Sequence, residues 1–147
     1  VIGIGSTSTR KWAQIHKKEL IEALRLGQGN YTAIIWVQGE SDAAEGIGAE
    51  ESYANLKQII EESRRIQPGI PWYISLNGLT FAGPNPMGPA RFAQIKLVHE
   101  GVARAGADLD ILRKDPSNFQ PDGAELLGDG FKKFAIEWKT ILEKDMR

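Results

Sequence analysis

The order of apolar and polar residues along the chain alternates between two kinds of segment. Short segments that are apolar almost throughout are typical of buried strands, and Tyr31–Val37 has the composition of a strand covered on both faces. Longer segments have apolar residues every three or four positions, which is typical of helices with one buried side. The pattern predicts strands at Val1–Ile4, Tyr31–Val37, Pro71–Leu76 and Asp108–Leu112, and helices at Arg10–Leu26, Glu51–Ile66 and Arg91–Ala105.

Each predicted helix has an apolar face that we expect to be buried. On the first three helices these faces are Trp12, Ile15, Leu20, Ile21 and Leu24; Tyr53, Leu56, Ile59 and Ile60; and Phe92, Ile95, Val98 and Val102. A polar loop at Lys114–Gly123 precedes a last helix, whose face is Phe131, Phe134, Ala135, Trp138 and Leu142.

Strands that alternate with helices at this spacing predict an α/β fold with a parallel sheet between two helical layers. No linker divides the chain, so residues 1–147 are expected to form a single domain. Ligands of such folds bind at the carboxyl ends of the strands. Three polar segments fall there, namely Gly5–Ser8, Gln38–Asp42 and the loop before Asp122, and the Gly- and Pro-rich loop Asn77–Ala90 is a further candidate.

The composition limits the classes of molecule that we expect this chain to bind. The 147 residues include 18 basic and 19 acidic side chains without a basic run, so we expect neither nucleic acid nor an anionic membrane as partner. No apolar segment has the roughly 18 residues of a spanning helix. Cysteine is absent, which excludes disulfides and thiolate metal sites and leaves the compartment undetermined.

The segment Ile34–Asp42 places an amide and two carboxylates directly after a predicted buried strand. The Gln38 amide can donate a hydrogen bond to a developing oxyanion, and Gly39 allows backbone to approach a ligand closely. Glu40 can orient a base or accept a proton. A polar turn with helix-capping residues explains the same composition, so residues alone leave both interpretations open.

The residues Trp36-Val37-Gln38-Gly39-Glu40-Ser41-Asp42 resemble the Trp-x-Gln-Gly-Glu-(Ser/Thr)-(Asp/Asn) block of the sialate O-acetylesterase and acetylxylan esterase group of SGNH (GDSL-like) hydrolases. Three weaker resemblances to the same group occur in the same order. They are Ile4–Ser8 followed by Trp12, Arg91-Phe92-Ala93-Gln94, and Asp122-Gly123-Ala124-Glu125-Leu126 followed by Gly130-Phe131. Together the four blocks span nearly the whole chain.

The resemblance implies a flavodoxin-like SGNH hydrolase fold, incomplete at its N-terminus, and acyl transfer from acetylated carbohydrates without a metal or other cofactor. It implies that an upstream serine is the nucleophile. It further implies catalytic roles for Glu40, Asp122 and Glu125, and oxyanion or substrate-binding roles for Gly5, Ser6, Gln38, Gly39 and Arg91.

The chain differs from the group at the two positions that carry its chemistry, the nucleophile and the catalytic base. The Gly-x-Ser block with the nucleophile precedes the first block found here, and Glu125 stands where the group has its catalytic histidine. A glutamate, with an ordinary pKa of about 4.3, is a poor base for a serine hydroxyl. The two histidines, His16 and His99, lie in predicted amphipathic helices. Neither Gly5–Ser8 nor Ser41 is favoured as a replacement nucleophile.

The resemblance also implies the strand order 2-1-3-4-5, in which the first strand is not among these residues. Val1–Ile4 and Tyr31–Val37 would then be separated by about 10 Å, with unpaired backbone facing the gap. We expect a homo-oligomer, a partner segment or sequence upstream of Val1 to supply the strand, or the two strands to close up.

Two other functions remain open. The chain could be a catalytically inactive homologue that binds carbohydrate. Alternatively, Glu40, Asp122 and Glu125 could cluster to share protons, to hold a divalent cation, or to act as a glycosidase-like pair. For Glu125, a solvated position near the start of the last helix is an equally good explanation.

Overall fold

A computed structural model describes residue 4 and residues 7–27, 29–77, 88–121 and 125–146. The first helical stretch is continuous and comprises α1 (Thr9–Lys11), a π-helix (Trp12–His16) and α2 (Lys17–Gly27). The elements that follow are β1 (Ile34–Trp36), α3 (Glu40–Ala44), α4 (Ala49–Ile66), β2 (Trp72–Leu76), α5 (Pro89–His99), β3 (Arg104–Asp108), α6 (Leu109–Leu112), a 3-10 helix (Pro116–Asn118) and α7 (Gly128–Asp145).

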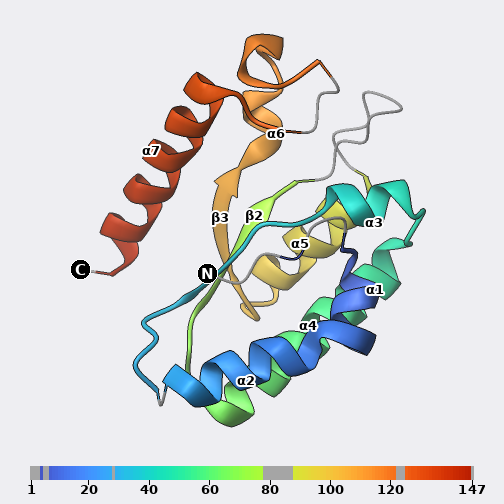
Figure 1. Cartoon of the computed structure of the whole chain (residues 1–147), viewed down its shortest axis with the longest axis vertical. Coiled ribbons are helices and arrows are strands. Elements are labelled where there is room, and N and C mark those ends of the chain that lie inside the picture. Colours follow the sequence, from blue (N-terminus) through green and yellow to red (C-terminus); the bar gives the residue numbers. More distant parts are fainter. Residues whose placement is uncertain (1–3, 5–6, 28, 78–87, 122–124, 147) are drawn as a thin grey trace.

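The three strands of the described residues form one parallel sheet in the order β1-β2-β3. Ile34 of β1 pairs with Trp72 of β2, and Tyr73 of β2 pairs with Arg104 of β3. Figure 1 shows α2, α4 and α5 on one side of this sheet and α7 on the other. The predicted α/β class with a parallel sheet is therefore confirmed.

The core lies on both faces of β2. Trp72 and Ile74 point into the larger cluster with Trp36, Leu56 and other residues of α4 and the first helix. Tyr73 points to the opposite face, into a smaller cluster that α7 closes with Trp138. All three β2 side chains are fully buried, and burial of a large apolar side chain stabilises the fold by roughly 1.5–3 kcal/mol.

The first helix differs from the prediction at one position. Trp12, Leu20 and Leu24 are buried as expected, but Ile15 is 56% exposed. The π-helical segment Trp12–His16 explains the difference, because its wider turn takes the residue three positions after Trp12 off the buried face.

The predicted strand Asp108–Leu112 is wrong. Arg104–Asp108 forms β3, and Leu109–Leu112 is the short helix α6, capped by the Asp108 side chain. The predicted helix Arg91–Ala105 ends earlier, at His99, and Gly101 adopts a left-handed φ of 70° just beyond it. The strand β3 consists mostly of small residues, which do not give the apolar pattern of a buried strand. Packing requires one of them, because a side chain at Gly106 would overlap the ring of Trp138.

Three predicted burial patterns are also wrong. Ile35 and Val37 are each 48% exposed, so the strand at Tyr31–Val37 is covered on one face only. The observed strand β1 is shorter than predicted and lies at an edge of the described sheet. Helix α7 packs over β3 and leaves the outer face of β1 uncovered. Phe92 and Phe131 are half-exposed or more, because α5 buries Ala93 and Leu97 instead and α7 buries Trp138.

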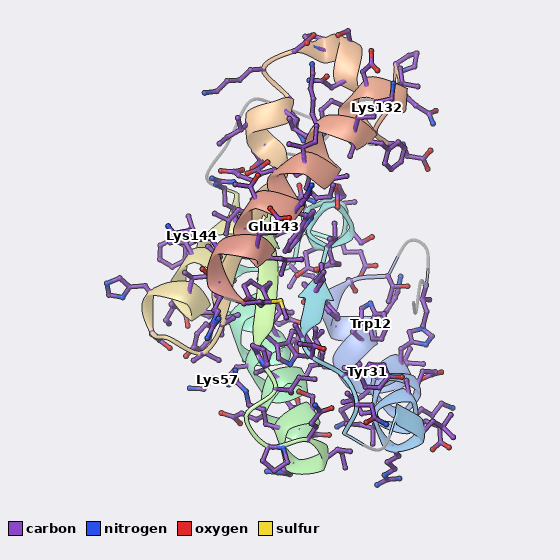
Figure 2. All side chains as sticks on the ribbon, turned by 90° about the vertical axis from the view of Figure 1, so that its left-hand side faces the viewer. Trp12, Tyr31, Lys57, Lys132, Glu143 and Lys144 are labelled. Atoms are coloured by element: carbon purple, nitrogen blue, oxygen red, sulfur yellow. The ribbon has the colours of Figure 1, made fainter. Side chains whose placement is uncertain are left out.

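The exposed side of α7 carries charged residues together with two apolar ones, Phe131 and Ile136. Lys132, Glu143 and Lys144 lie along this helix, away from Trp12 and Tyr31 on the other side of the sheet (Figure 2). Among the described residues, no helix combines the length and the apolar composition needed to span a bilayer.

Glu45 joins the loop after α3 to the first helix. Its carboxylate accepts hydrogen bonds from Lys11 Nζ at 2.7 Å and from Ser8 Oγ at 2.9 Å. The Lys11 hydrogen bond, followed by that of Ser8, holds the pKa of Glu45 below its ordinary value. The folded state therefore binds the Glu45 proton more weakly than the unfolded state does, and this contribution to stability is lost as the pH falls through the lowered pKa.

We expect Glu45→Gln to lower the free energy of unfolding by about 0.5 kcal/mol at neutral pH, a small effect because the pair contacts solvent. Urea unfolding of the variant and the parent across the acid range is the measurement. The difference between the two should vanish at a pH below the lowered pKa of Glu45. A difference that stays constant down to acid pH contradicts the assignment.

Candidate functional site

The carboxyl ends of β1 and β2 are held together by Gln94, which is buried in α5. Its Nε2 donates to the Gln38 carbonyl at 2.8 Å, and its Oε1 accepts from the Asn77 backbone N–H at 2.7 Å. Gln94 thus joins the residues that follow β1 and β2 at one edge of the sheet, beyond the last backbone pairs of the two strands. The side chain of Gln38 and the start of α3 consequently lie at the edge where parallel sheets bind ligands.

Gly39 is required at this junction by close packing. Its backbone lies against the Asn77 carbonyl group, and a methyl group added to Gly39 would overlap that carbonyl oxygen. The φ of 166° is extended and accessible to any residue, so sterics rather than backbone conformation select glycine. The close contact at Gly39 is thus with the protein's own backbone, and the predicted approach to a ligand remains a prediction.

Asp42 is the most highly connected side chain of the site. Its carboxylate is fully buried and accepts from the Thr9 backbone N–H at 2.6 Å, from Thr9 Oγ1 at 2.7 Å and from Gln38 Nε2 at 2.8 Å. Ser52 Oγ donates to Oδ2, the same oxygen that accepts from Thr9 Oγ1. One carboxylate therefore links the start of the first helix, the end of β1, α3 and α4.

The Gln38 amide is oriented by this arrangement. An amide nitrogen carries two hydrogens, and among the described residues Asp42 takes one of those on Gln38 Nε2. Gln38 is only partly buried and lines an open groove along β1. Its second N–H is consequently a positioned donor at the edge of the sheet.

A chain of ion pairs crosses the same edge from α3 to β3. Arg113 contacts Glu40 at 3.3 Å and Asp110 at 3.5 Å, and Arg91 contacts Asp110 at 3.1 Å. Arg91 also forms a two-pronged pair with Asp108 at 2.6 and 2.7 Å. Hydrogen bonding to Asp108 is the main reason that the pKa of the Arg91 guanidinium is raised. The network fixes α3, α5 and α6 relative to one another.

The predicted site residues fall into three groups. Gln38, Gly39 and Glu40 lie together at the end of β1, and the ion pairs connect Arg91 to Glu40. Glu125 is exposed and accepts from Gln120 Nε2 at 2.8 Å, and within the described chain no hydrogen bond or ion pair joins it to Glu40. The predictions for Gly5, Ser6 and Asp122 lie outside the described residues.

Among the described contacts, neither histidine is joined to Gln38 or Glu40. His16, in the π-helix, lies 3.5 Å from Glu19 of α2, and His99 is exposed at the last residue of α5. Crossover helices run antiparallel to the strands, so the end of α5 lies at the amino edge of the sheet, opposite Gln38. Of the serines near this edge, Ser8 is fully buried and donates to Glu45.

Among the described residues, which do not include Asp122, no group of three or more histidine, aspartate or glutamate side chains could hold a metal ion. Glu40 is neutralised by Arg113, and Glu125 lies on a different loop. With Asp122 outside the described residues, proton sharing among the three remains a prediction.

Sequence reasoning missed four residues that shape this edge, namely Asn77, Asp108, Asp110 and Arg113. Asn77 had a usable signal, because it directly follows a buried strand. Its side chain is fully buried, and neither amide atom has a hydrogen-bond partner among the described residues. The ion pair of Glu40 and Arg113 carried no local signal, since these residues are 73 positions apart.

Comparison with known proteins found neither a matching family model nor a matching curated protein.

Replacement of Arg91 by methionine tests the ion-pair chain. The variant leaves Asp108 and Asp110, both mostly buried, without their shared cation. We expect the free energy of unfolding to fall by about 2 kcal/mol at neutral pH, below the loss for fully buried pairs because some water reaches this edge. Urea unfolding is the measurement, and Lys139→Met, at an exposed pair on α7, is the matched control with a change near zero. Equal losses in both variants contradict a structural role for the network.

Proposed function

We propose that this chain forms the oxyanion-stabilising side of an SGNH-type carbohydrate O-acetyl esterase. The observation that carries the proposal is the Gln38 amide, which stands at the carboxyl end of a parallel strand and is oriented by the buried Asp42 carboxylate. Both residues belong to the motif Trp36–Asp42. Its last residue, Asp42, orients the Gln38 amide.

In the proposed reaction, the serine oxygen attacks the acetyl carbonyl carbon and negative charge develops on the carbonyl oxygen. The second N–H of Gln38 donates to that oxygen, and the backbone N–H of Gly5 is the proposed second donor. A donor that is already oriented stabilises the transition state without reorganisation, and removal of one such donor typically lowers kcat by about 100- to 1,000-fold.

The proton-transfer side of the site is the incomplete part of the proposal. Glu40 is held by an ion pair with Arg113 at 3.3 Å, which suits a group that orients a base. Asp122 and Glu125 are proposed on the motif alone. The nucleophilic serine, and a base stronger than Glu125, must come from another segment placed beside Gln38.

The proposal is tested on the natural open reading frame that contains this chain, assayed for acetate release from acetylated xylan and acetylated sialic acid. We expect Gln38→Ala to lower kcat by about 100-fold with little change in KM, because the amide acts on the transition state. Gln58→Ala, an exposed glutamine on α4, is the matched control. Unchanged activity in Gln38→Ala, at preserved thermal stability, overturns the proposal.

A second candidate is a carbohydrate-binding module without catalytic activity. It is favoured by two salt bridges, which join Glu40 to Arg113 and Arg91 to Asp108, and by the position of His99 at the end of α5. Titration calorimetry with acetylated xylo-oligosaccharides distinguishes it from the esterase. Binding heat together with no acetate release from the full reading frame supports the module, whereas acetate release excludes it.

A further inference from the structure

Four donors surround the buried Asp42 carboxylate. Its Oδ1 accepts from the Thr9 backbone N–H at 2.6 Å and from Gln38 Nε2 at 2.8 Å. Its Oδ2 accepts from Thr9 Oγ1 at 2.7 Å and from Ser52 Oγ. An ionised carboxylate has about four lone-pair sites and can only accept. Each of the four groups therefore donates, and the direction of every hydrogen bond is fixed.

These hydrogen bonds also fix the plane of the carboxylate. Rotation of an aspartate carboxylate about its last bond is soft, because that torsion lacks sharp staggered minima. Thr9 opposes the rotation at both oxygens, since its N–H holds Oδ1 and its hydroxyl holds Oδ2. Ser52 is a second anchor at Oδ2. The direction in which Oδ1 faces Gln38 is thus set by Thr9 and Ser52.

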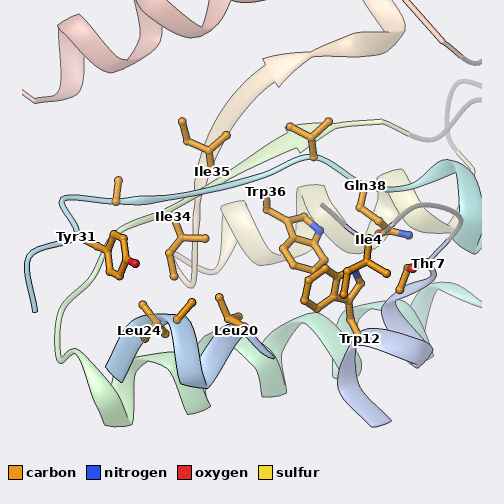
Figure 3. A pocket seen from close by; sticks show the side chains of 13 residues that line it. Ile4, Thr7, Trp12, Leu20, Leu24, Tyr31, Ile34, Ile35, Trp36 and Gln38 are labelled. Carbon is orange, nitrogen blue, oxygen red and sulfur yellow. The ribbon is translucent and has the colours of Figure 1, made fainter. Parts of the chain in front are cut away.

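The Gln38 amide depends on this anchored carboxylate. It lies at the end of a flexible side chain, and among the described residues that side chain hydrogen-bonds only to Asp42. Figure 3 shows Gln38 and Thr7 at one end of the groove along β1, away from Leu24 and Tyr31 at the other end. Gln38 is only partly buried there, so packing alone would leave its amide several rotamers.

Thr9 itself is rigidly placed. It is fully buried at the first position of α1, where Ser8 caps the helix by accepting from the Lys11 N–H. The helical stretch continues from Thr9 to Gly27 without a break. Backbone N–H groups of a first helical turn have no partner within the helix, so that of Thr9 is available to Asp42. The end of β1 is thereby tied to the start of a long helix.

From this geometry we infer that Thr9 is a positioning residue for the Gln38 amide and acts through the Asp42 carboxylate. It holds the carboxylate so that Gln38 presents its second N–H to the oxyanion. Thr9 lies outside the motif Trp36–Asp42, and the resemblance assigns it no role. The inference rests on the proposed function for the reaction that the amide serves, whereas the orientation of the amide is measurable without that reaction.

The kinetic test uses the natural open reading frame and two substitutions of Thr9. Thr9→Val keeps the shape of the side chain and removes its hydroxyl, whereas Thr9→Ser keeps the hydroxyl. We expect Thr9→Val to lower kcat for acetate release about tenfold with little change in KM, because an unanchored glutamine is spread over several rotamers. Thr9→Ser should retain most of the parent kcat. Thr140→Val, which removes an exposed hydroxyl on α7, is the matched control.

A second substitution covers the case in which Thr9→Val does not fold. Ser52→Ala removes one donor from Oδ2 without adding bulk, and alanine is favourable in a helix. It should lower kcat in the same direction by a smaller factor, again with little change in KM. A purely structural role would lower stability and leave kcat of the folded enzyme unchanged.

Nuclear magnetic resonance of protein labelled with isotopic glutamine measures the orientation without any reaction. A hydrogen bond to a carboxylate separates the shifts of the two Gln38 amide protons, and Gln38→Ala assigns the signal. We expect the two shifts to approach each other in Thr9→Val and to stay apart in Thr9→Ser.

Three results overturn the inference. The first is an active parent whose kcat is unchanged in folded Thr9→Val, an outcome that leaves the proposed function intact. The second is an equal loss of kcat in Thr9→Ser and Thr9→Val, which assigns the effect to packing. The third is a pair of Gln38 amide shifts that Thr9→Val does not alter. A parent that releases no acetate contradicts the proposed function, and the amide shifts then decide the role of Thr9.

Discussion

Replacement of Asp42 by alanine is expected to lower the free energy of unfolding by about 3–5 kcal/mol, a large part of the stability of a domain of this size. The carboxylate is fully buried and accepts from Thr9, Gln38 and Ser52. The variant leaves the donors of Thr9 and Ser52 buried without an acceptor, and each unsatisfied group costs about 1–3 kcal/mol. Urea unfolding followed by circular dichroism is the measurement.

Asp129→Ala is the matched control, because that carboxylate is 78% exposed on α7 and pairs with a solvated lysine. It should change the free energy of unfolding by no more than about 0.5 kcal/mol. If Asp42→Ala proves too unstable to fold, Asp42→Asn retains one acceptor oxygen and should lose about half as much. A loss below about 1 kcal/mol in Asp42→Ala contradicts its role as the link between four elements.

Replacement of Gly39 by alanine is expected to lower the free energy of unfolding by about 3 kcal/mol, because the new methyl group overlaps the Asn77 carbonyl oxygen. The overlap is with backbone that Gln94 holds in place, so it cannot be relieved by a side-chain rotation. The same displacement moves Gln38 and Glu40 relative to the end of β2. Thermal and urea unfolding measure the loss.

Gly48→Ala is a suitable control for Gly39→Ala. Its φ of −70° suits any residue, and no atom lies within 4 Å of the added methyl group. The control should be neutral within about 0.5 kcal/mol. Equal stability of Gly39→Ala and Gly48→Ala is the outcome that rules out close packing at the end of β1.

Most of the helix and strand pattern could be predicted from the sequence because burial imposes a period. Leu56, Ile59 and Ile60 mark the buried side of α4, and the apolar segment before Leu76 marks β2. The prediction failed where tertiary packing selects small residues. Arg104–Asp108 has no β-branched or aromatic residue, yet it forms a strand because Gly106 fits beneath the Trp138 ring.

The candidate site was predictable in part. A polar segment after a buried strand located Gln38, Gly39 and Glu40 at the edge of the sheet, and the structure places them there. The partners of these residues come from distant segments. Gln94 follows Gln38 by 56 positions and Arg113 follows Glu40 by 73. No local pattern encodes such pairs, so their roles in fixing the site were missed.

The sequence by itself determined the parallel α/β class and the positions of the main helices, because hydrophobic period is a local property of the chain. Only the tertiary structure decided that Asp42 is a buried link and that Ile35 and Val37 remain half-exposed. These outcomes depend on which surfaces come together when the helices pack on the sheet. That is a property of the whole fold and not of any one segment.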